Sequence, residues 1–324
     1  MTFSTTSLLA PVEQDLKKMT DRLKQLIGAR HPLLGAAAEH LFDAGGKRIR
    51  PAIVLLASRA TMLERPLTER HRRLAEITEM IHTASLVHDD VVDEADLRRS
   101  VKTVNSLFGD KIAVLAGDFL FAQSSWYLAN LNNLEVVKLL SEVIKDFAEG
   151  EIMQSINRFD IDASIDSYLD KTYYKTASLM ANSAKAAAVL SDSSTEVAEN
   201  LYNYGRNLGL AFQIVDDILD FTGSAEVLGK PAGLDLASGK LTSPVFYALQ
   251  QQPYLEILIE REFSEPEDIE RAFDLIKNSD GIEQARQLAK DLAVKADLSL
   301  GCLAPSASKN ALRELTDYAV SRIY

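Results

Sequence analysis

Apolar residues recur at helical spacing along almost the entire chain, and this pattern predicts helices. In residues 11–29, for example, Leu16, Met19, Leu23 and Leu26 form one apolar stripe. Stretches that alternate apolar and polar residues between turns, which would predict strands, are absent from the sequence. The sequence therefore predicts an all-α fold, with further helices over residues 33–43, 47–60, 66–96, 102–108, 110–130, 134–157, 165–190, 195–221, 240–250, 254–260, 267–276, 280–300 and 308–323.

The predicted helices are separated by short breaks rich in glycine and proline. The longest break is GSAEVLGKPAGLDLASGK, which begins at Gly223, and long ordered loops of this kind are often functional lids. No Pro/Gly/Ser-rich linker, repeat or low-complexity block divides the chain. We therefore predict one domain over residues 1–324, a single large bundle of helices with about ten flexible residues at its start.

The charge of the chain limits the partners that it can have. Lys and Arg number 35 against 47 Asp and Glu, which gives a net charge of −12 and predicts no binding to nucleic acid. The lone Cys302 excludes a disulfide framework. No apolar run approaches the roughly 20 residues of a membrane span, and the N-terminus lacks the features of a secretory signal. We expect a protein of the bacterial or cyanobacterial cytoplasm, or of the plastid stroma if the chain is a mature form.

The stretch LVHDDVVDEADLRRS concentrates negative charge at the end of an apolar helical run. On a helix, Asp93 lies one turn after Asp89, and His82 lies two turns before it. Ser85 and Ile81 continue the same face, as expected for the wall of a pocket below a charged rim. Carboxylates one turn apart suit Mg²⁺, which takes oxygen ligands and shares them with substrate phosphates.

A second acidic cluster, QIVDDILDF, contains Asp216, Asp217 and Asp220 inside another apolar helical run. Unpaired buried carboxylates cost several kcal/mol each, so two such clusters indicate bound cations. Two acidic helices facing one another across a cavity would hold several Mg²⁺ ions and neutralise a diphosphate.

Basic residues accompany the acidic clusters. The motif GGKRIRP is predicted to put Lys47 and Arg50 on one helix face after a Gly-Gly turn, where a helix start also favours anions. The other basic residues are Arg98 and Arg99 after the first cluster, Lys175 beside Thr176, and Lys230 and Lys240 in or near the glycine-rich segment. Any one of these basic residues could instead be ordinary surface charge.

Other classes of protein explain less of the pattern. GGKR is not a nucleotide-binding P-loop, because no strand precedes it and Arg follows Lys47. His88 and Asp89, with His40 upstream, would suit a metal-dependent phosphohydrolase of the His-Asp type, but that reading explains the first cluster alone. A non-catalytic helical scaffold is expected to have lost one of the two clusters.

Taken together, the motifs resemble the polyprenyl synthetase family, the trans-isoprenyl diphosphate synthases. The resemblance runs from about residue 30 to the C-terminus and includes AGGKRIRP, EMIHTASLVHDDVVDEADLRR, YYKTASL, FQIVDDILDF, GKPAGLDLASGKLTSPVFYAL and KNALRELTDYAVSRIY. Terpene cyclases share a first Asp-rich motif, but their second metal motif is of a different, Asn-Ser-Glu type. The resemblance implies an isoprenoid synthase-like bundle around a central cavity.

The family implies a role for each matching residue. Isopentenyl diphosphate would be bound by Lys47, Arg50, His82 and Arg99. Mg²⁺ would be held by Asp89, Asp93 and Asp216, with Asp90, Asp217 and Asp220 in support. The allylic diphosphate would contact Arg98, Lys175, Thr176, Gln213 and Lys230. The resemblance thus implies prenyl transfer by ionisation of an allylic diphosphate and attack of the isopentenyl double bond. Asp89, Asp93, Lys175, Asp216 and Lys230 would be the catalytic set.

The length of the product is expected to depend on residues just before the first aspartate. Short-chain members of the family carry an aromatic residue there, whereas this chain has Ala84 and Ser85, with Ile81 one turn deeper. A pocket left open for another turn or two predicts an all-trans product of about C40 to C50, with solanesyl C45 favoured. A shorter, geranylgeranyl-type product is the alternative.

The resemblance also implies partners for the chain. Members of the family are usually homodimers, and residues 110–130 are a candidate interface. The long products serve as quinone side chains, so we expect a peripheral membrane contact during product release.

Overall fold

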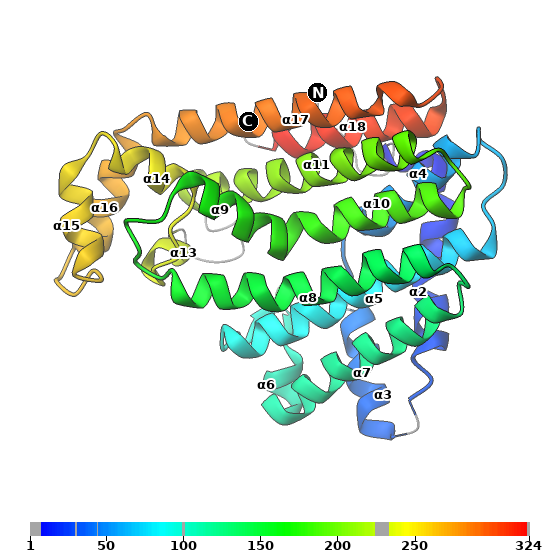
Figure 1. Ribbon diagram of the computed structural model, residues 1–324. Helices are drawn as coiled ribbons and strands as arrows, with labels where there is room; N and C mark the ends of the chain where they lie inside the picture. The colour runs from blue at the N-terminus through cyan, green and yellow to red at the C-terminus, as the bar shows by residue number, and fades with distance from the viewer. Residues whose placement is uncertain (1–7, 30, 44, 99–100, 224–232, 323–324) are drawn as a thin grey trace. The chain divides into compact units, whose positions relative to one another are not determined.

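The structure is a computed structural model that describes residues 8–29, 31–43, 45–98, 101–223 and 233–322. It is built almost entirely of helices, as the periodicity predicts (Figure 1). The helices are η1 (Ala10–Val12), α2 (Glu13–Ile27), α3 (Pro32–Asp43), α4 (Ile49–Thr61), α5 (Glu69–Val92), α6 (Val104–Phe108), α7 (Asp110–Ala129), α8 (Leu134–Ile156), α9 (Ile165–Thr172), η2 (Tyr173–Ala177), α10 (Ser178–Leu190), α11 (Thr195–Thr222), α13 (Leu234–Ala237), α14 (Ser243–Leu249), α15 (Pro253–Glu260), α16 (Asp268–Lys277), α17 (Gly281–Ser299), η3 (Leu300–Cys302) and α18 (Ala307–Ser321). The all-α prediction is confirmed.

A small hairpin contains the only strands in the described part of the chain. Strand β1 (Leu97–Arg98) pairs with β2 (Val101–Lys102) in antiparallel register, with Arg98 opposite Val101. The sequence predicts no strand here, because strands of two residues are too short to show an alternating pattern. The hairpin follows the first acidic cluster directly, so it determines where Arg98 lies.

Several predicted helix boundaries differ from those of the structure. The helix predicted over 47–60 begins at Ile49, because Arg48 adopts a left-handed conformation with φ of 52°. Lys47 therefore precedes the helix, and the prediction that Lys47 and Arg50 share one helix face is wrong. The helix predicted over 165–190 is interrupted by a π-helical turn, η2, that contains Lys175. Such turns occur often at functional sites.

The chain divides into two compact units. The first contains residues 1–145, 179–205 and 300–315, and the second contains residues 146–178, 206–299 and 316–324. The single domain expected from the sequence stays a prediction. Within the first unit, Leu8 and Leu9 are buried, so the described start of the chain packs onto the core.

Helix α5 is the centre of the first unit. It packs against α4 on one side and α7 on another, and residues around most of its circumference are buried. At the contact with α7, Gly117 allows a close approach: a Cβ atom there would lie 2.2 Å from Nε2 of His88. The backbone of α7 thus lies directly against the end of α5 that carries the first acidic cluster.

Helix α7 is long and apolar. Among the described residues it alone has the length and composition of a possible span, with a mean hydropathy of 1.2 over its best 18-residue window. The expectation that no apolar run approaches the length of a membrane span is therefore wrong for α7. Buried core helices pass the same test, and 33% of this window is buried inside the protein.

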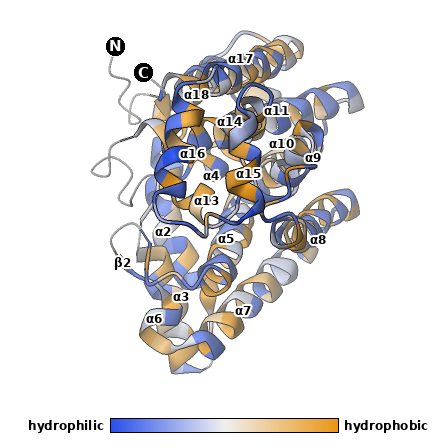
Figure 2. Cartoon of the chain, turned by 90° about the vertical axis from the view of Figure 1, so that its left-hand side faces the viewer, coloured by the Kyte–Doolittle hydropathy of each residue, from blue (hydrophilic) through white to orange (hydrophobic). Residues whose placement is uncertain are grey.

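The second unit has its own apolar core. Buried residues of α11, from Leu210 to Phe221, pack with residues of α14, α15, α16 and α17. Figure 2 shows α15 as mainly hydrophobic, and its Tyr254 and Ile257 are about half exposed. This core also contains Tyr168, which contacts Asp217 of α11.

His71, in the first turns of α5, is buried in a network of hydroxyl groups. Its Nδ1 lies 2.8 Å from Oγ1 of Thr68, and its Nε2 lies 3.2 Å from Oγ of Ser191 on the loop after α10. Burial lowers the pKa of His71 to about 4, and the neighbouring Arg70 and Arg72 act in the same direction.

This environment predicts that the protein loses stability in mild acid. In the unfolded chain His71 titrates near 6.5, so between pH 6.5 and 4 the unfolded state binds more protons. We expect the free energy of unfolding to fall by on the order of 1 kcal/mol as the pH drops from 7 to 5. Urea unfolding at several pH values measures this. A His71→Gln variant should show a smaller pH dependence, and an unchanged slope in that variant would contradict the assignment.

Candidate active site

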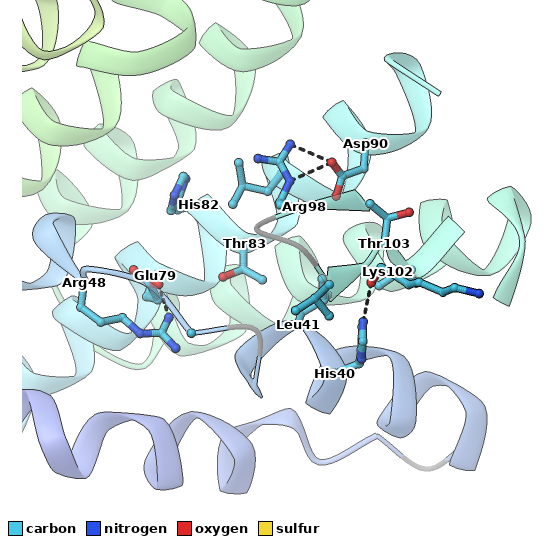
Figure 3. Close-up of a pocket in the computed structure, with 14 residues that line it drawn as sticks. His40, Leu41, Arg48, Glu79, His82, Thr83, Asp90, Arg98, Lys102 and Thr103 are labelled. Atoms are coloured by element: carbon cyan, nitrogen blue, oxygen red, sulfur yellow. Dashed lines mark hydrogen bonds and ion pairs between the residues drawn. The ribbon is translucent and has the colours of Figure 1, made fainter. Parts of the chain in front are cut away.

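Three of the predicted site residues, His82, Asp90 and Arg98, line a pocket of the first unit (Figure 3). The pocket has a volume of about 50 Å³ and is lined by residues of α3, α5, the hairpin and the segment before α4. His82 lines it, and Nη1 of Arg50 lies 3.1 Å from Nε2 of this histidine. Arg48, also on the wall, forms an ion pair with Glu79. Arg50 and His82, both predicted to bind isopentenyl diphosphate, are thus in direct contact.

The first acidic cluster separates into one buried and two accessible carboxylates. Asp90 is 4% exposed and forms an ion pair with Arg98, whose Nη2 and Nε lie 2.7 Å and 2.8 Å from one carboxylate oxygen. Asp89 is half-buried, and Asp93 is exposed at the C-terminal cap of α5. The N–H of Asp93 still donates to the carbonyl of Asp89 at 2.8 Å, so one helical turn separates the two as predicted.

The three residues expected to control chain length have different surroundings. Ile81 and Ala84 have no exposed surface, and Ala84 packs in a core cluster with Met80 and Leu120. Ser85 is half-buried, like His82 and Asp89, and its hydroxyl donates to the carbonyl of His82 at 2.9 Å. Ser85 is therefore the one of the three that lies on the accessible face.

In the second unit, three predicted site residues form a chain of hydrogen bonds with Tyr168. The hydroxyl of Thr176 donates to Oε1 of Gln213 at 3.0 Å, and Nε2 of Gln213 donates to Oδ1 of Asp217 at 2.9 Å. The hydroxyl of Tyr168 donates to the other carboxylate oxygen of Asp217 at 2.5 Å. Each member orients the next, so the network fixes the position of Thr176.

Asp217, like Asp220, is a buried member of the second acidic cluster. Burial raises the pKa of Asp217 to about 7, although the hydrogen bonds from Tyr168 and Gln213 act in the opposite direction. Burial and the adjacent carboxylate also raise the pKa of Tyr168, so its hydroxyl remains the donor. A nearby cation would favour the ionised form of Asp217.

Asp216 is the accessible member of this cluster, and Asp220 is held by the backbone. The side chain of Asp216 is 42% exposed and forms an ion pair with Arg322. A carboxylate oxygen of Asp220 accepts a hydrogen bond from the N–H of Asp235 at 3.4 Å. The three aspartates thus have three different environments within two turns of one helix.

Lys175 is positioned by helix α8. Its ammonium lies 2.5 Å from a carboxylate oxygen of Glu151. Gly150, the residue before Glu151, leaves room for the π-helical turn. A Cβ atom at Gly150 would lie 2.9 Å from Cγ of Lys175. The predicted site lysine is therefore held by a residue pair that the sequence analysis did not single out.

The accessible carboxylates have the chemistry that Mg²⁺ requires. Asp89, Asp93 and Asp216 offer oxygen ligands at half-buried or exposed positions, which fits a hard cation shared with substrate phosphates. Within the described ranges, no group of three or more His, Cys, Asp or Glu side chains is arranged to hold a metal by itself.

Not every predicted site residue can be located. Arg99 and Lys230 lie outside the described residues. Lys47 is exposed in the segment before α4. The histidines of the phosphohydrolase alternative have other partners: Nε2 of His40 lies 2.8 Å from the carbonyl of Lys102, and Nε2 of His88 lies 3.1 Å from that of Val114.

The structure adds residues that the sequence analysis missed. Glu151, Tyr168 and Arg322 contact predicted site residues directly. Lys171 is a further example, since burial lowers the pKa of its ammonium near Asp217. The available signals were weak: Tyr168 lies two helical turns before Lys175, and Arg322 lies in the tail that carries part of the resemblance.

Comparison with known proteins identifies the family of the chain. Residues 31–276 match the family model described as polyprenyl synthetase. The chain is 68% identical over 321 residues to a prenyl transferase of Synechocystis sp., covering 99% of both chains. It is 55% identical to a chloroplastic solanesyl-diphosphate synthase 2 of Oryza sativa subsp. japonica, covering 99% of this chain and 80% of that protein.

The fold agrees as well. The structure is similar to the crystal structure of a polyprenyl synthase from Caulobacter crescentus in complex with calcium and isoprenyl diphosphate. The TM-score is 0.91 and the sequence identity 35%, covering 100% of this chain and 99% of that one. The chain therefore belongs to the polyprenyl synthetase family. It is a prenyltransferase with the isoprenoid synthase helical fold.

Proposed function

We propose that this prenyltransferase condenses isopentenyl diphosphate repeatedly onto an allylic diphosphate to make a long all-trans-polyprenyl diphosphate. The observation that carries this is the pair of acidic clusters, each with an accessible aspartate and each accompanied by predicted diphosphate-binding cations. The small, half-buried Ser85 beside His82 and Asp89 supports a long product. The rice relative is named as a solanesyl-diphosphate synthase, and this supports a product of C45.

The roles of the residues follow from their charge and surroundings. Arg50 and His82, which contact one another, with Lys47 and Arg99, bind isopentenyl diphosphate. Asp89 and Asp93 in one cluster and Asp216 in the other hold Mg²⁺ ions. The Caulobacter protein, which was crystallised with calcium and isoprenyl diphosphate, supports the pairing of divalent cation and diphosphate. Arg98, Lys175, Thr176, Gln213 and Lys230 bind the allylic diphosphate.

The chemistry requires stabilisation of a leaving group rather than a nucleophilic side chain. When bound, Mg²⁺ would supply Lewis-acid stabilisation of the diphosphate. Lys175 and Thr176 are held in place by Glu151 and Gln213, so their donors are oriented before the allylic bond ionises. The apolar positions near Ser85 offer no base. We assign the departing diphosphate as the acceptor of the proton that the adduct loses.

We also propose a homodimer built on α7. Val114, Leu115 and Trp126 are 39%, 46% and 61% exposed, while Ala116 and Leu120 of the same helix are buried against the unit's own core. Exposed apolar residues along one helix are typical of an interface between subunits. The expected location is the bacterial or cyanobacterial cytoplasm, or the stroma, for which the name of the rice relative as chloroplastic gives support.

The proposal is tested by sizing the product. The purified protein is incubated with Mg²⁺, isopentenyl diphosphate and each allylic primer in turn, and the dephosphorylated products are separated by chromatography. We expect a main product of C45, and none when Mg²⁺ is removed by chelation. A C20 main product would favour the geranylgeranyl-type alternative, and failure to consume isopentenyl diphosphate would contradict the proposed function altogether.

A further inference from the structure

Arg322, directly after α18, lies against two residues of α11. Its Nη2 donates to Oδ1 of Asp216, and its guanidinium carbon lies 4.1 Å from the centroid of the Phe212 ring. Phe212 and Asp216 are one helical turn apart, so the guanidinium covers one face of a single turn. The side chain of Arg322 is 16% exposed and that of Asp216 is 42% exposed. The arginine is therefore packed in place, whereas the carboxylate remains accessible.

The guanidinium of Arg322 occupies a place beside Asp216 that a metal ion bound to this carboxylate would take. A carboxylate oxygen that accepts a hydrogen bond from a guanidinium has one fewer lone pair to offer to a metal ion. The positive charge of Arg322 also repels a divalent cation at a separation of a few ångströms. Binding of an ion to Asp216 thus competes directly with the ion pair.

Arg322 has a second contact that does not depend on Asp216. The Phe212 ring attracts the guanidinium through its π-electrons, and this attraction persists when the carboxylate is occupied by an ion. Nε of Arg322 is buried and has no hydrogen-bond partner within the described part of the chain. The arginine can therefore leave Asp216 while it stays at the ring, with donors available for an anionic oxygen.

We infer that Arg322 is a positioning residue that neutralises Asp216 in the metal-free enzyme and is displaced from the carboxylate when a divalent cation binds there. The inference rests on the proposed function, in which Asp216 holds Mg²⁺. It assigns a role to a residue far along the chain from both acidic clusters. It also implies that the ion pair raises the concentration of metal that the site requires.

The expected effect is a gain in metal affinity when the arginine is removed. A half-exposed ion pair of this kind contributes up to about 1 kcal/mol, so Arg322→Gln should bind the ion about fivefold more tightly. Arg322→Lys keeps the positive charge and should stay within about twofold of the wild-type affinity. Arg271→Gln is a matched control, since it removes a cation from an exposed ion pair with Glu267 in the same unit.

The experiment measures Mn²⁺ binding by electron paramagnetic resonance, without substrates, in the wild-type protein and the three variants. Mn²⁺ takes the same oxygen ligands as Mg²⁺ and is detected directly. Thermal unfolding of each variant shows that it is folded. Tighter binding in Arg322→Gln alone supports the inference, whereas unchanged or weaker binding in that variant overturns it.

A second measurement uses the wild-type chain and does not depend on a variant. Phenylglyoxal modifies accessible guanidinium groups, and mass spectrometry of the digested protein reports modification at Arg322. We expect faster modification of Arg322 with Mg²⁺ than with chelator, and equal rates under the two conditions would overturn the inference. If the wild-type protein neither binds Mn²⁺ nor consumes isopentenyl diphosphate, the proposed function itself fails. Normal condensation with an unchanged Arg322→Gln affinity refutes only the role of Arg322.

Discussion

Replacement of Asp89 with alanine is expected to reduce the condensation rate by about 10³-fold or more, because the charge that opposes the departing diphosphate is lost with its metal ligand. Asp89 is half-buried near the end of α5, and its side chain is not part of the apolar core. The fold should therefore survive the substitution. Steady-state incorporation of labelled isopentenyl diphosphate into product measures the effect, and thermal unfolding reports the fold.

A matched control comes from the same acidic segment. Asp96 is exposed after the end of α5. We expect Asp96→Asn to retain most of the activity. Near-normal turnover in Asp89→Ala, or an equal loss in Asp96→Asn, would contradict the assignment of Asp89 as a metal ligand.

Replacement of Ser85 with phenylalanine is expected to shorten the main product by several isoprene units. Ser85 shares the accessible face of α5 with His82 and Asp89, so a ring at this position would block a chain that grows along the helix. The rate of the first condensation should change little, because the residues that bind the two diphosphates are untouched. Chromatography of dephosphorylated products with a short allylic primer measures the distribution.

Ala84 provides the contrast. It has no exposed surface and packs with Met80 and Leu120, so a phenylalanine there would overfill the core and lower stability by about 1 to 3 kcal/mol. We expect Ala84→Phe to lower the unfolding temperature, whereas Ser85→Phe should leave it nearly unchanged. A Ser85→Ala variant should keep the long product. An unchanged product length in a folded Ser85→Phe protein would refute this model of the pocket.

Most of the helices could be predicted because each buries a regular stripe of apolar residues. Residues 110–130 and 195–221 were predicted nearly to the residue, since long periodic segments carry the strongest signal. Local backbone choices were harder. The left-handed conformation of Arg48 and the π-helical turn at Lys175 leave the hydrophobic period almost unchanged, so periodicity alone does not reveal them.

The candidate site was predictable to the level of motifs. The two acidic clusters and the basic residues near them stand out by composition, because so much charge rarely follows an apolar helical run without a function. The surroundings of each side chain were not predictable to the same degree. Ala84 and Ser85 are adjacent and both small, yet one is enclosed by α2, α3 and α7 while the other lies on the accessible face.

By itself, the sequence determined the family, the all-α fold and the positions of the acidic clusters, because these depend on residue type and on spacing within single helices. Tertiary packing determines which aspartates are buried and which cations accompany them. Asp216 and Arg322 are 106 residues apart, and Lys175 and Glu151 are 24 apart. Contacts over such distances depend on how helices pack, and a helical period gives the direction of a side chain but not the element that covers it.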